Sequence, residues 1–236
     1  MKYALPAALA ALMLAASAPA QDLNSAEIVV TGSRIEQDGY SRDMPAVGLR
    51  RPADFLVQEV TIRGDTRDAK QRSQEIYAML AKAVDLAARN GVELAYGDYI
   101  LTPLTAENMK ELTLQRDTRP DSERITFLAK VRLSPQMSGK QAQERIGKYI
   151  DSVPEVGRAQ MDSGDEPTLS IVGPDSYRAQ IAAVIGDDAR AMAAKIGEGY
   201  KVQVEGLNMP VQWTRASASE VLLYIPYKLT IVPQPQ

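Results

Sequence analysis

Apolar residues recur every three or four positions in three segments of the chain, the spacing that gives an α-helix one apolar face. The first segment covers 68–90. The second is short and begins after Ser138, which with Gln141 fits a capping box, where each side chain binds the other's backbone N–H. The third begins at Pro174 or the residue after it, because proline suits a first helical turn, and it ends at Gly197. These segments predict three helices.

Other segments alternate apolar and polar residues, which is the two-residue period of a strand with one buried face. The alternation is strict over 125–133. It is imperfect over 55–63, where the apolar residues change parity and a bulge near 58–59 would reconcile them. The run 221–231 predicts a long strand, in which Pro226 indicates a sheet edge or a bulge.

Shorter strands are predicted at 27–32, 168–172 and 201–207, and strand or extended loop at 92–104 and 111–116. Helices do not separate these strands regularly, so the pattern does not favour a doubly wound parallel sheet. It predicts an α+β fold with mostly antiparallel sheets packed by about three helices.

Residues 1–20 have the pattern of a cleavable signal peptide. Lys2 supplies a positive start, an apolar run of alanine, leucine and methionine follows, and small residues precede a cleavage position before Gln21. The apolar run is shorter than the roughly 20 residues that a transmembrane anchor needs. We therefore expect export to the periplasm, with no transmembrane segment after cleavage. The rest divides into an N-terminal strand and loop extension over 21–51 and a main domain over 52–236.

The chain contains no cysteine and no histidine among its 236 residues. Their absence excludes thiol nucleophiles, thiolate metal sites, and catalytic or zinc sites built on imidazole. The 27 basic and 30 acidic residues give a formal net charge of −3, whereas nucleic-acid binding depends on clustered cationic contacts with phosphate. The glycine-rich phosphate and dinucleotide patterns are also missing. We therefore expect no nucleic-acid partner, no metal and no cofactor.

Several short motifs follow one another along 26–233 in an order that resembles the SIMPL-domain family of exported bacterial proteins. They are a VxVTGxG-like strand at 28–32, a proline-containing strand entry at 52–54 that leads to Gly64-Asp65-Thr66 at a helix start, a helix end at Asn90-Gly91-Val92, an alanine-rich helix at 188–197, and closing strands at 201–207 and 221–231. The resemblance implies a periplasmic or envelope location and, as in some members, assembly into large rings or channel-like homo-oligomers. It implies no catalytic residue.

The segment 27–34 also resembles a TonB box, the N-terminal segment of certain outer-membrane receptors that pairs as an added strand with an energising periplasmic protein. The chain lacks the repeated amphipathic strands of a transmembrane barrel, so it is not itself predicted to be such a receptor. The candidate partner-binding residues are Glu27, Ile28, Val29, Val30, Thr31 and Gly32. The alternative is that 28–31 is the first strand of the folded domain.

Two groups of acidic residues are candidates for acid–base chemistry without histidine. Asp162, Asp165 and Glu166 lie close together beside glycine and proline, and Asp187 and Asp188 are adjacent in the third helix. The first group does not match the ligand spacing of a calcium-binding loop. We interpret both groups as solvated surface acids.

The chain is therefore expected to be a non-catalytic periplasmic or envelope protein, acting as an oligomeric scaffold or a binding protein. One alternative is an accessory protein of TonB-linked outer-membrane transport that acts through 27–34, with an envelope protein as partner. A second alternative is a carboxylate-based hydrolase. Trp213 and Tyr224 either line an apolar pocket or pack in the core.

Overall fold

The computed structural model describes residues 27–30, 47–164 and 166–233. Its helices are α1 (Ala69–Ala87), α2 (Gly139–Ser152) and α3 (Arg178–Ile196). Its strands are β1 (Glu27–Val30), β2 (Leu49–Pro52), β3 (Phe55–Gly64), β4 (Glu93–Tyr96), β5 (Thr102–Pro103), β6 (Gln115–Arg116), β7 (Glu123–Arg132), β8 (Gln160–Ser163), β9 (Thr168–Val172), β10 (Tyr200–Glu205), β11 (Gln212–Arg215), β12 (Glu220–Tyr224) and β13 (Lys228–Pro233). The signal peptide predicted for 1–20 lies outside the described residues.

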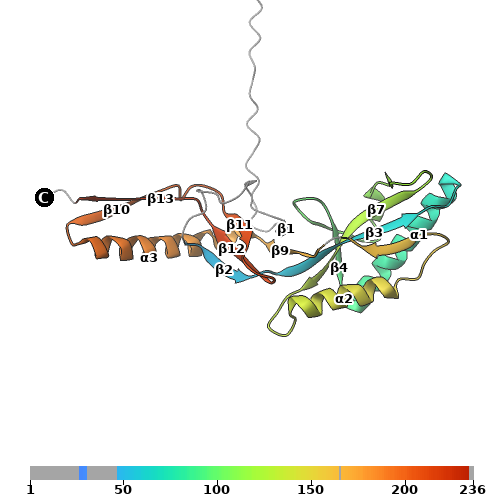
Figure 1. The fold of residues 1–236 in the computed structure, drawn as a ribbon, viewed down its shortest axis with the longest axis horizontal. Helices are drawn as coiled ribbons and strands as arrows, with labels where there is room; N and C mark the ends of the chain where they lie inside the picture. The colour runs from blue at the N-terminus through green and yellow to red at the C-terminus, as the bar shows by residue number, and fades with distance from the viewer. Residues whose placement is uncertain (1–26, 31–46, 165, 234–236) are drawn as a thin grey trace, which may run out of the picture.

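Every strand pair in the described part of the chain is antiparallel, and this confirms the predicted α+β fold. The largest sheet has the order β1-β9-β3-β7-β4-β5, with β8 also on β3 and β6 also on β7. A second sheet has the order β11-β12-β2, and β10 pairs with β13 in a separate ribbon. The molecule is elongated, with α1 and α2 at one end and α3 with the ribbon at the other (Figure 1).

Capping groups confirm the predicted ends of the first helix and the predicted start of the second. The Asp68 carboxylate accepts a hydrogen bond from the Gln71 backbone N–H at 2.7 Å, and Gly91 ends the first helical segment in the left-handed conformation at φ 65°. Ser138 and Gln141 form both hydrogen bonds of the capping box. The third helix was expected to begin at Pro174 or the residue after it, but a 3-10 turn occupies Pro174–Tyr177 and α3 begins only at Arg178.

The core of the main sheet lies between the β3–β7 pair and helices α1 and α2. The two strands stay in register from Phe55 opposite Arg132 to Gly64 opposite Glu123. The Tyr149 hydroxyl on α2 donates to the Ala83 carbonyl on α1 at 2.9 Å, which ties the two helices together inside the core. Other core side chains include Leu56, Val60, Ile62, Ile76, Leu80, Ile125, Phe127 and Ile146.

The bulge expected near 58–59 is absent, because β3 pairs with β7 without interruption. The parity change has another cause: β3 is buried on both faces over its first half. Val57 faces away from the helices and is fully buried, and Gln58 faces them with 4 % exposure. The Gln58 side chain donates to the Gly164 carbonyl at 3.2 Å, which satisfies a polar group at a core position.

The long strand expected over 221–231 is instead two strands in different sheets. β12 pairs with β11 and β2, whereas β13 pairs with β10. Pro226 lies between them and has no N–H for either ladder. Gly206 passes so close that an added Cβ would lie 2.6 Å from the Pro226 carbonyl oxygen. The chain therefore changes sheet at this proline rather than forming an edge strand through it.

The β11-β12-β2 sheet joins the same hydrophobic core as the main sheet. Trp213 and Leu223 lie opposite each other on β11 and β12, and both are buried. Ile181 and Ile185 from the first half of α3 belong to that core as well. Since β2 pairs with β12, the predicted boundary between an extension ending at residue 51 and a domain starting at 52 falls inside a strand of this sheet.

A buried polar network fixes the start of α1 against the loop before β8. The Glu75 carboxylate accepts hydrogen bonds from the Thr66 hydroxyl at 2.5 Å, the Gln71 side chain at 2.9 Å and the Arg158 backbone N–H at 3.2 Å. The Thr66 hydroxyl, followed by the Arg158 N–H, holds the pKa of Glu75 below its ordinary value of 4.5, against the opposing effect of burial.

This network predicts an acid-sensitive contribution to stability. Because the folded-state pKa of Glu75 is lowered, its contribution is fully present above the unfolded-state pKa and is lost as the pH falls through the folded-state value. The unfolding free energy of the native chain should therefore fall more steeply below about pH 5 than that of Glu75→Gln. Denaturant titrations of both proteins at several pH values measure this difference. Equal slopes would contradict the assignment.

Candidate functional site

The predicted partner-binding segment begins as an edge strand of the main sheet. β1 pairs antiparallel with β9, from Glu27 opposite Val172 to Val30 opposite Leu169. The remaining residues of the TonB-box-like segment, at 31–34, lie outside the described residues. The described part of the segment is therefore already hydrogen-bonded to the protein's own sheet along one edge.

Glu27 connects β1 to a buried lysine of the central strand β7. Its carboxylate forms an ion pair with the Lys130 ammonium and accepts a hydrogen bond from the Ser170 hydroxyl at 2.6 Å. Lys130 is 5 % exposed and lies 4.2 Å from the centre of the Phe55 ring, a cation–π contact. The Glu27 carbonyl also accepts the Leu101 N–H at 3.0 Å. These contacts fix the first described residue of the chain in the fold.

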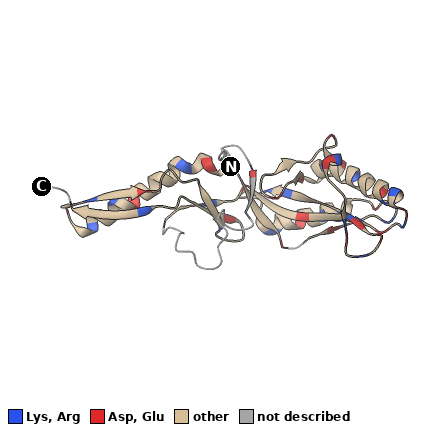
Figure 2. Cartoon of the chain, turned by 90° about the horizontal axis from the view of Figure 1, so that it is seen from above, with Lys and Arg blue, Asp and Glu red and all other residues tan. Residues whose placement is uncertain are grey.

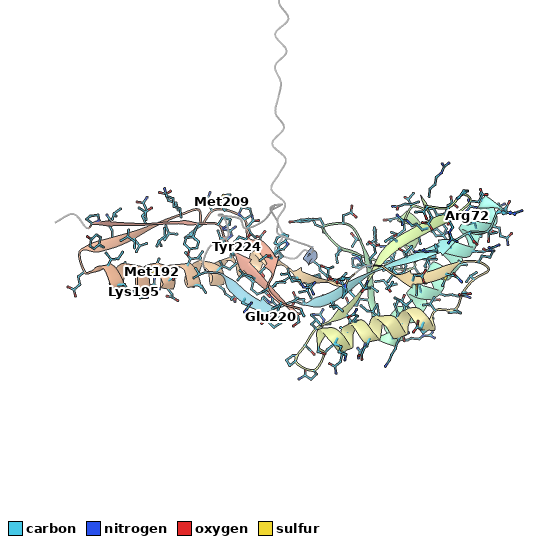
Figure 3. The ribbon with its side chains drawn as sticks, in the orientation of Figure 1. Arg72, Met192, Lys195, Met209, Glu220 and Tyr224 are labelled. Carbon is cyan, nitrogen blue, oxygen red and sulfur yellow. The ribbon has the colours of Figure 1, made fainter. Side chains whose placement is uncertain are left out.

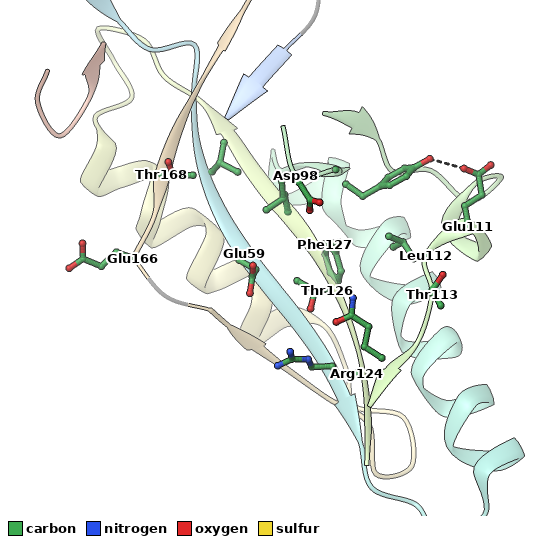
Figure 4. Close-up of a pocket in the computed structure, with 15 residues that line it drawn as sticks. Glu59, Asp98, Glu111, Leu112, Thr113, Arg124, Thr126, Phe127, Glu166 and Thr168 are labelled. Atoms are coloured by element: carbon green, nitrogen blue, oxygen red, sulfur yellow. Dashed lines mark hydrogen bonds between the residues drawn. The ribbon is translucent and has the colours of Figure 1, made fainter. Parts of the chain in front are cut away.

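A polar groove of 660 Å³ opens over β3 and β7 on the face opposite α1 and α2 (Figure 4). Side chains from β3 and β7 form its floor, and the segments 96–98 and 111–115 form a wall. The Tyr96 hydroxyl donates to the Glu111 carboxylate at 2.8 Å, and this bond raises the pKa of Tyr96. The charged residues that line the groove are Glu59, Asp98, Glu111, Arg124 and Glu166. The acidic excess favours cations over anions in this groove.

The acidic residues singled out in the sequence lie in different parts of the molecule. Asp162 is on β8, 3.5 Å from the Arg63 guanidinium, and Glu166 lines the groove. Asp187 forms an ion pair with Arg190 on the exposed side of α3. Asp188 accepts a hydrogen bond from Tyr227, whose pKa is raised mainly by burial.

Asp165 lies outside the described residues. Among those that are described, no group of three or more carboxylates has the geometry to hold a metal ion. The structure therefore does not gather the described members of the two acidic groups into one centre.

Trp213 and Tyr224 pack in the core, each with 1 % exposure. The Trp213 ring contacts the Tyr99 ring at a centroid distance of 5.7 Å. Of the two interpretations that the sequence left open, core packing is the one that the structure supports.

The far end of the molecule is a thin projection that we call the arm, residues 190–209 and 228–233. It consists of the last two turns of α3 and the β10–β13 ribbon (Figures 1 and 3). We include the turn after β10, which lies at the base of the arm, where Arg178 at the start of α3 donates to the Leu207 and Met209 carbonyls. No residue of the arm is buried. Its exposed large apolar side chains are Met192 (41 %), Ile196 (52 %), Tyr200 (40 %), Leu207 (38 %) and Met209 (43 %).

Sequence periodicity places Met192 and Ile196 on the same helix face as the buried Ile181 and Ile185. The four residues are spaced as one helix face requires. Only Ile181 and Ile185 on that face are buried, whereas Met192 and Ile196, nearer the end of α3, are exposed. Periodicity identifies a helix face and does not reveal whether the fold supplies a surface to cover it. The exposed arm was therefore not predictable from the helix pattern alone.

Comparison with known proteins gives little similarity. No family's sequence profile and no curated protein matches the chain. A hydrolase from Listeria innocua aligns structurally at 12 % identity over 76 % of this chain and 90 % of its own, with a TM-score of 0.15. An uncharacterized conserved protein from Listeria innocua aligns at 12 % identity over 76 % and 91 %, with a TM-score of 0.14. The resemblance to the SIMPL-domain family stays a prediction. None of the helices in the described residues has the length and apolar character to span a bilayer.

Proposed function

We propose that this protein is an exported, non-catalytic envelope protein that works by assembling with copies of itself through the arm. The observation that carries the proposal is the arm's uncovered apolar surface. Large apolar side chains that gather on the surface of one region often mark a contact with another protein. In the arm, α3 covers one face of the ribbon, but side chains such as Met192 and Ile196 stay exposed. Contact with a second molecule would bury them.

The arrangement of titratable groups supports a role other than catalysis. The sequence offers no histidine or cysteine, and the acids Asp162, Asp187 and Asp188 occupy separate surface positions with their own partners. General acid–base catalysis by carboxylates requires groups that converge on one reacting bond. The carboxylate-hydrolase alternative therefore has less support than assembly.

An accessory role in TonB-linked transport is the second candidate. It would require β1 to leave β9, or to accept a further strand on its other edge. Glu27 is tied to Lys130, Ser170 and the Leu101 N–H, and these contacts oppose release of the strand. The anchored strand favours the assembly proposal.

Substitution of the exposed apolar residues tests the proposal. We expect the double variant Met192→Ser/Ile196→Ser to weaken self-association by about tenfold or more. The substitutions remove apolar side-chain area that association would otherwise bury. Its unfolding free energy at low concentration should change by less than about 1 kcal/mol. Light scattering coupled to size-exclusion chromatography measures the mass distribution.

The matched control is Val172→Thr, which changes an exposed apolar residue outside the arm. Its mass distribution should equal that of the native chain. An unchanged distribution for the double variant, or an equal change for the control, would show that the arm is not the assembly surface.

A further inference from the structure

The sequence of β10 is complementary to itself. Residues 201–205 read Lys-Val-Gln-Val-Glu, so that reading outward from Gln203 gives a valine on each side, then a lysine on one side and a glutamate on the other. An antiparallel copy of this strand centred on Gln203 would place opposite charges beside each other twice. Within its own ribbon Glu205 already lies opposite Lys228, whereas Lys201 lies opposite the apolar Val232 and has no acidic residue across from it.

β10 also has the geometry to accept another strand. Among the described strands it pairs with β13 alone, so its second edge carries no strand partner there. Val202 lies opposite Ile231 and Val204 opposite Leu229, which gives the ribbon one apolar face. Val202 and Val204 are half-buried where α3 packs on β10, while the intervening residues are exposed. The helix therefore covers a face of the ribbon rather than its edge.

We propose that β10 pairs antiparallel with β10 of a second copy of this chain, about a two-fold axis that passes through Gln203. The inference rests on the proposed self-assembly and names the contact that forms it. Such a contact is isologous, because the same strand contributes from both subunits. Backbone hydrogen bonds provide the pairing, and side-chain charge fixes the register.

The register makes specific pairs. Lys201 lies opposite Glu205 of the partner subunit, and Val202 lies opposite Val204 of the partner subunit. The result is a four-stranded antiparallel sheet in the order β13-β10-β10-β13. Because opposite residues in an antiparallel pair point to the same face, both α3 helices lie on one side of this sheet. Each helix can then cover apolar surface of the other, including Met192 and Ile196, and the two main sheets lie at opposite ends of the dimer.

The outer edge of β13, which also has no partner among the described strands, fits a second copy less well. β13 carries Lys228 and no acidic residue, so an antiparallel copy of it has no opposite charge to pair with. It also ends at Pro233, which lacks the N–H that a ladder uses. Figure 2 shows that charges of both signs lie along the arm, and only those on β10 form a self-complementary set within one strand.

Cysteine cross-linking tests the contact directly, since the native chain has no cysteine. At the proposed axis the two copies of residue 203 face each other with Cα atoms about 4.5–5.5 Å apart, within disulfide range. We expect Gln203→Cys to give a covalent dimer under mild oxidation. The matched control is Thr230→Cys, which lies opposite Gln203 within the ribbon but on the outer strand. The control should stay monomeric on a denaturing gel.

Charge reversal tests the register. Lys201→Glu makes both charged positions of β10 acidic and Glu205→Lys makes both basic, so each variant should self-associate about tenfold more weakly than the native chain. An equimolar mixture of the two variants should associate to within about threefold of the native strength, because each acidic position then faces a basic one. The mixture is the internal control for folding, since mixing leaves each variant's own ribbon unchanged.

Two results separate this contact from the proposed function. If the native chain forms oligomers but Gln203→Cys fails to cross-link and the mixture gains no association, this contact is wrong and assembly uses another surface. If the native chain stays monomeric at all concentrations, both proposals fail.

Discussion

Replacement of Lys130 by methionine is expected to lower the unfolding free energy by about 3–5 kcal/mol, the usual cost of leaving one member of a buried ion pair unpaired. Lys130 and Glu27 have side chains that are 7 % and 13 % exposed. Methionine fills similar space without a charge. The Glu27 carboxylate would then keep the Ser170 hydroxyl as its side-chain partner in a largely dry position. Chemical denaturation measures the loss.

The double variant Glu27→Gln/Lys130→Met is the control for this effect. It removes both charges, so it should lose clearly less stability than Lys130→Met alone. Amide hydrogen exchange in β1 should rise in the single variant, because that strand is held at Glu27. An equal loss in both variants would show that Lys130 contributes through packing rather than through the ion pair.

Trp213→Ala is expected to cost about 3–5 kcal/mol, because truncation of a large core side chain leaves a cavity. Trp213 has 1 % exposure and connects the β11-β12-β2 sheet to the core shared with α1 and α2. If that core is continuous, the whole protein should unfold earlier in one cooperative transition. Circular dichroism during denaturation follows it.

The matched control is Tyr200→Ala, which truncates an aromatic residue that is 40 % exposed on the arm. In dilute protein it should cost less than about 1 kcal/mol. Two separate transitions in Trp213→Ala, with the main sheet unfolding at its native midpoint, would show that the two regions are independent folding units.

Local sequence patterns predicted the helices well, because a helix carries its own start and stop signals. Ser138 and Gln141 form the capping box that the sequence indicates, and Gly91 adopts the expected left-handed conformation. Strands were harder to predict. The four-residue strands β8 and β11 have too few positions to show a period, and their pairing depends on residues far away in the chain.

The strand predictions were wrong where buried and exposed residues do not simply alternate along the chain. β3 is covered on both faces near Val57, so its apolar residues do not alternate. Pro226 was interpreted as an edge or bulge, whereas it separates two strands that belong to different sheets. Neither error could be corrected from the local pattern, since both depend on which elements pack against the strand.

In the candidate site, too, the features that depend on contacts between distant residues could not be predicted from local sequence. The sequence makes Glu27 a candidate partner-binding residue, but its ion pair with Lys130 joins residues 103 positions apart, which no local pattern reveals. The uncovered arm was likewise invisible in the helix period of α3. The self-complementary order of charges on β10 is present in the sequence, yet its significance depends on the edge of β10 that has no partner among the described strands.

Native mass spectrometry of the protein released from the cell envelope tests export and self-assembly together. We expect a subunit mass that corresponds to a chain beginning at Gln21, together with species of multiple subunits whose abundance declines on dilution. A monomer alone at every micromolar concentration would show that the protein does not self-assemble, and a subunit that still carries residues 1–20 would show that the predicted signal peptide is not removed.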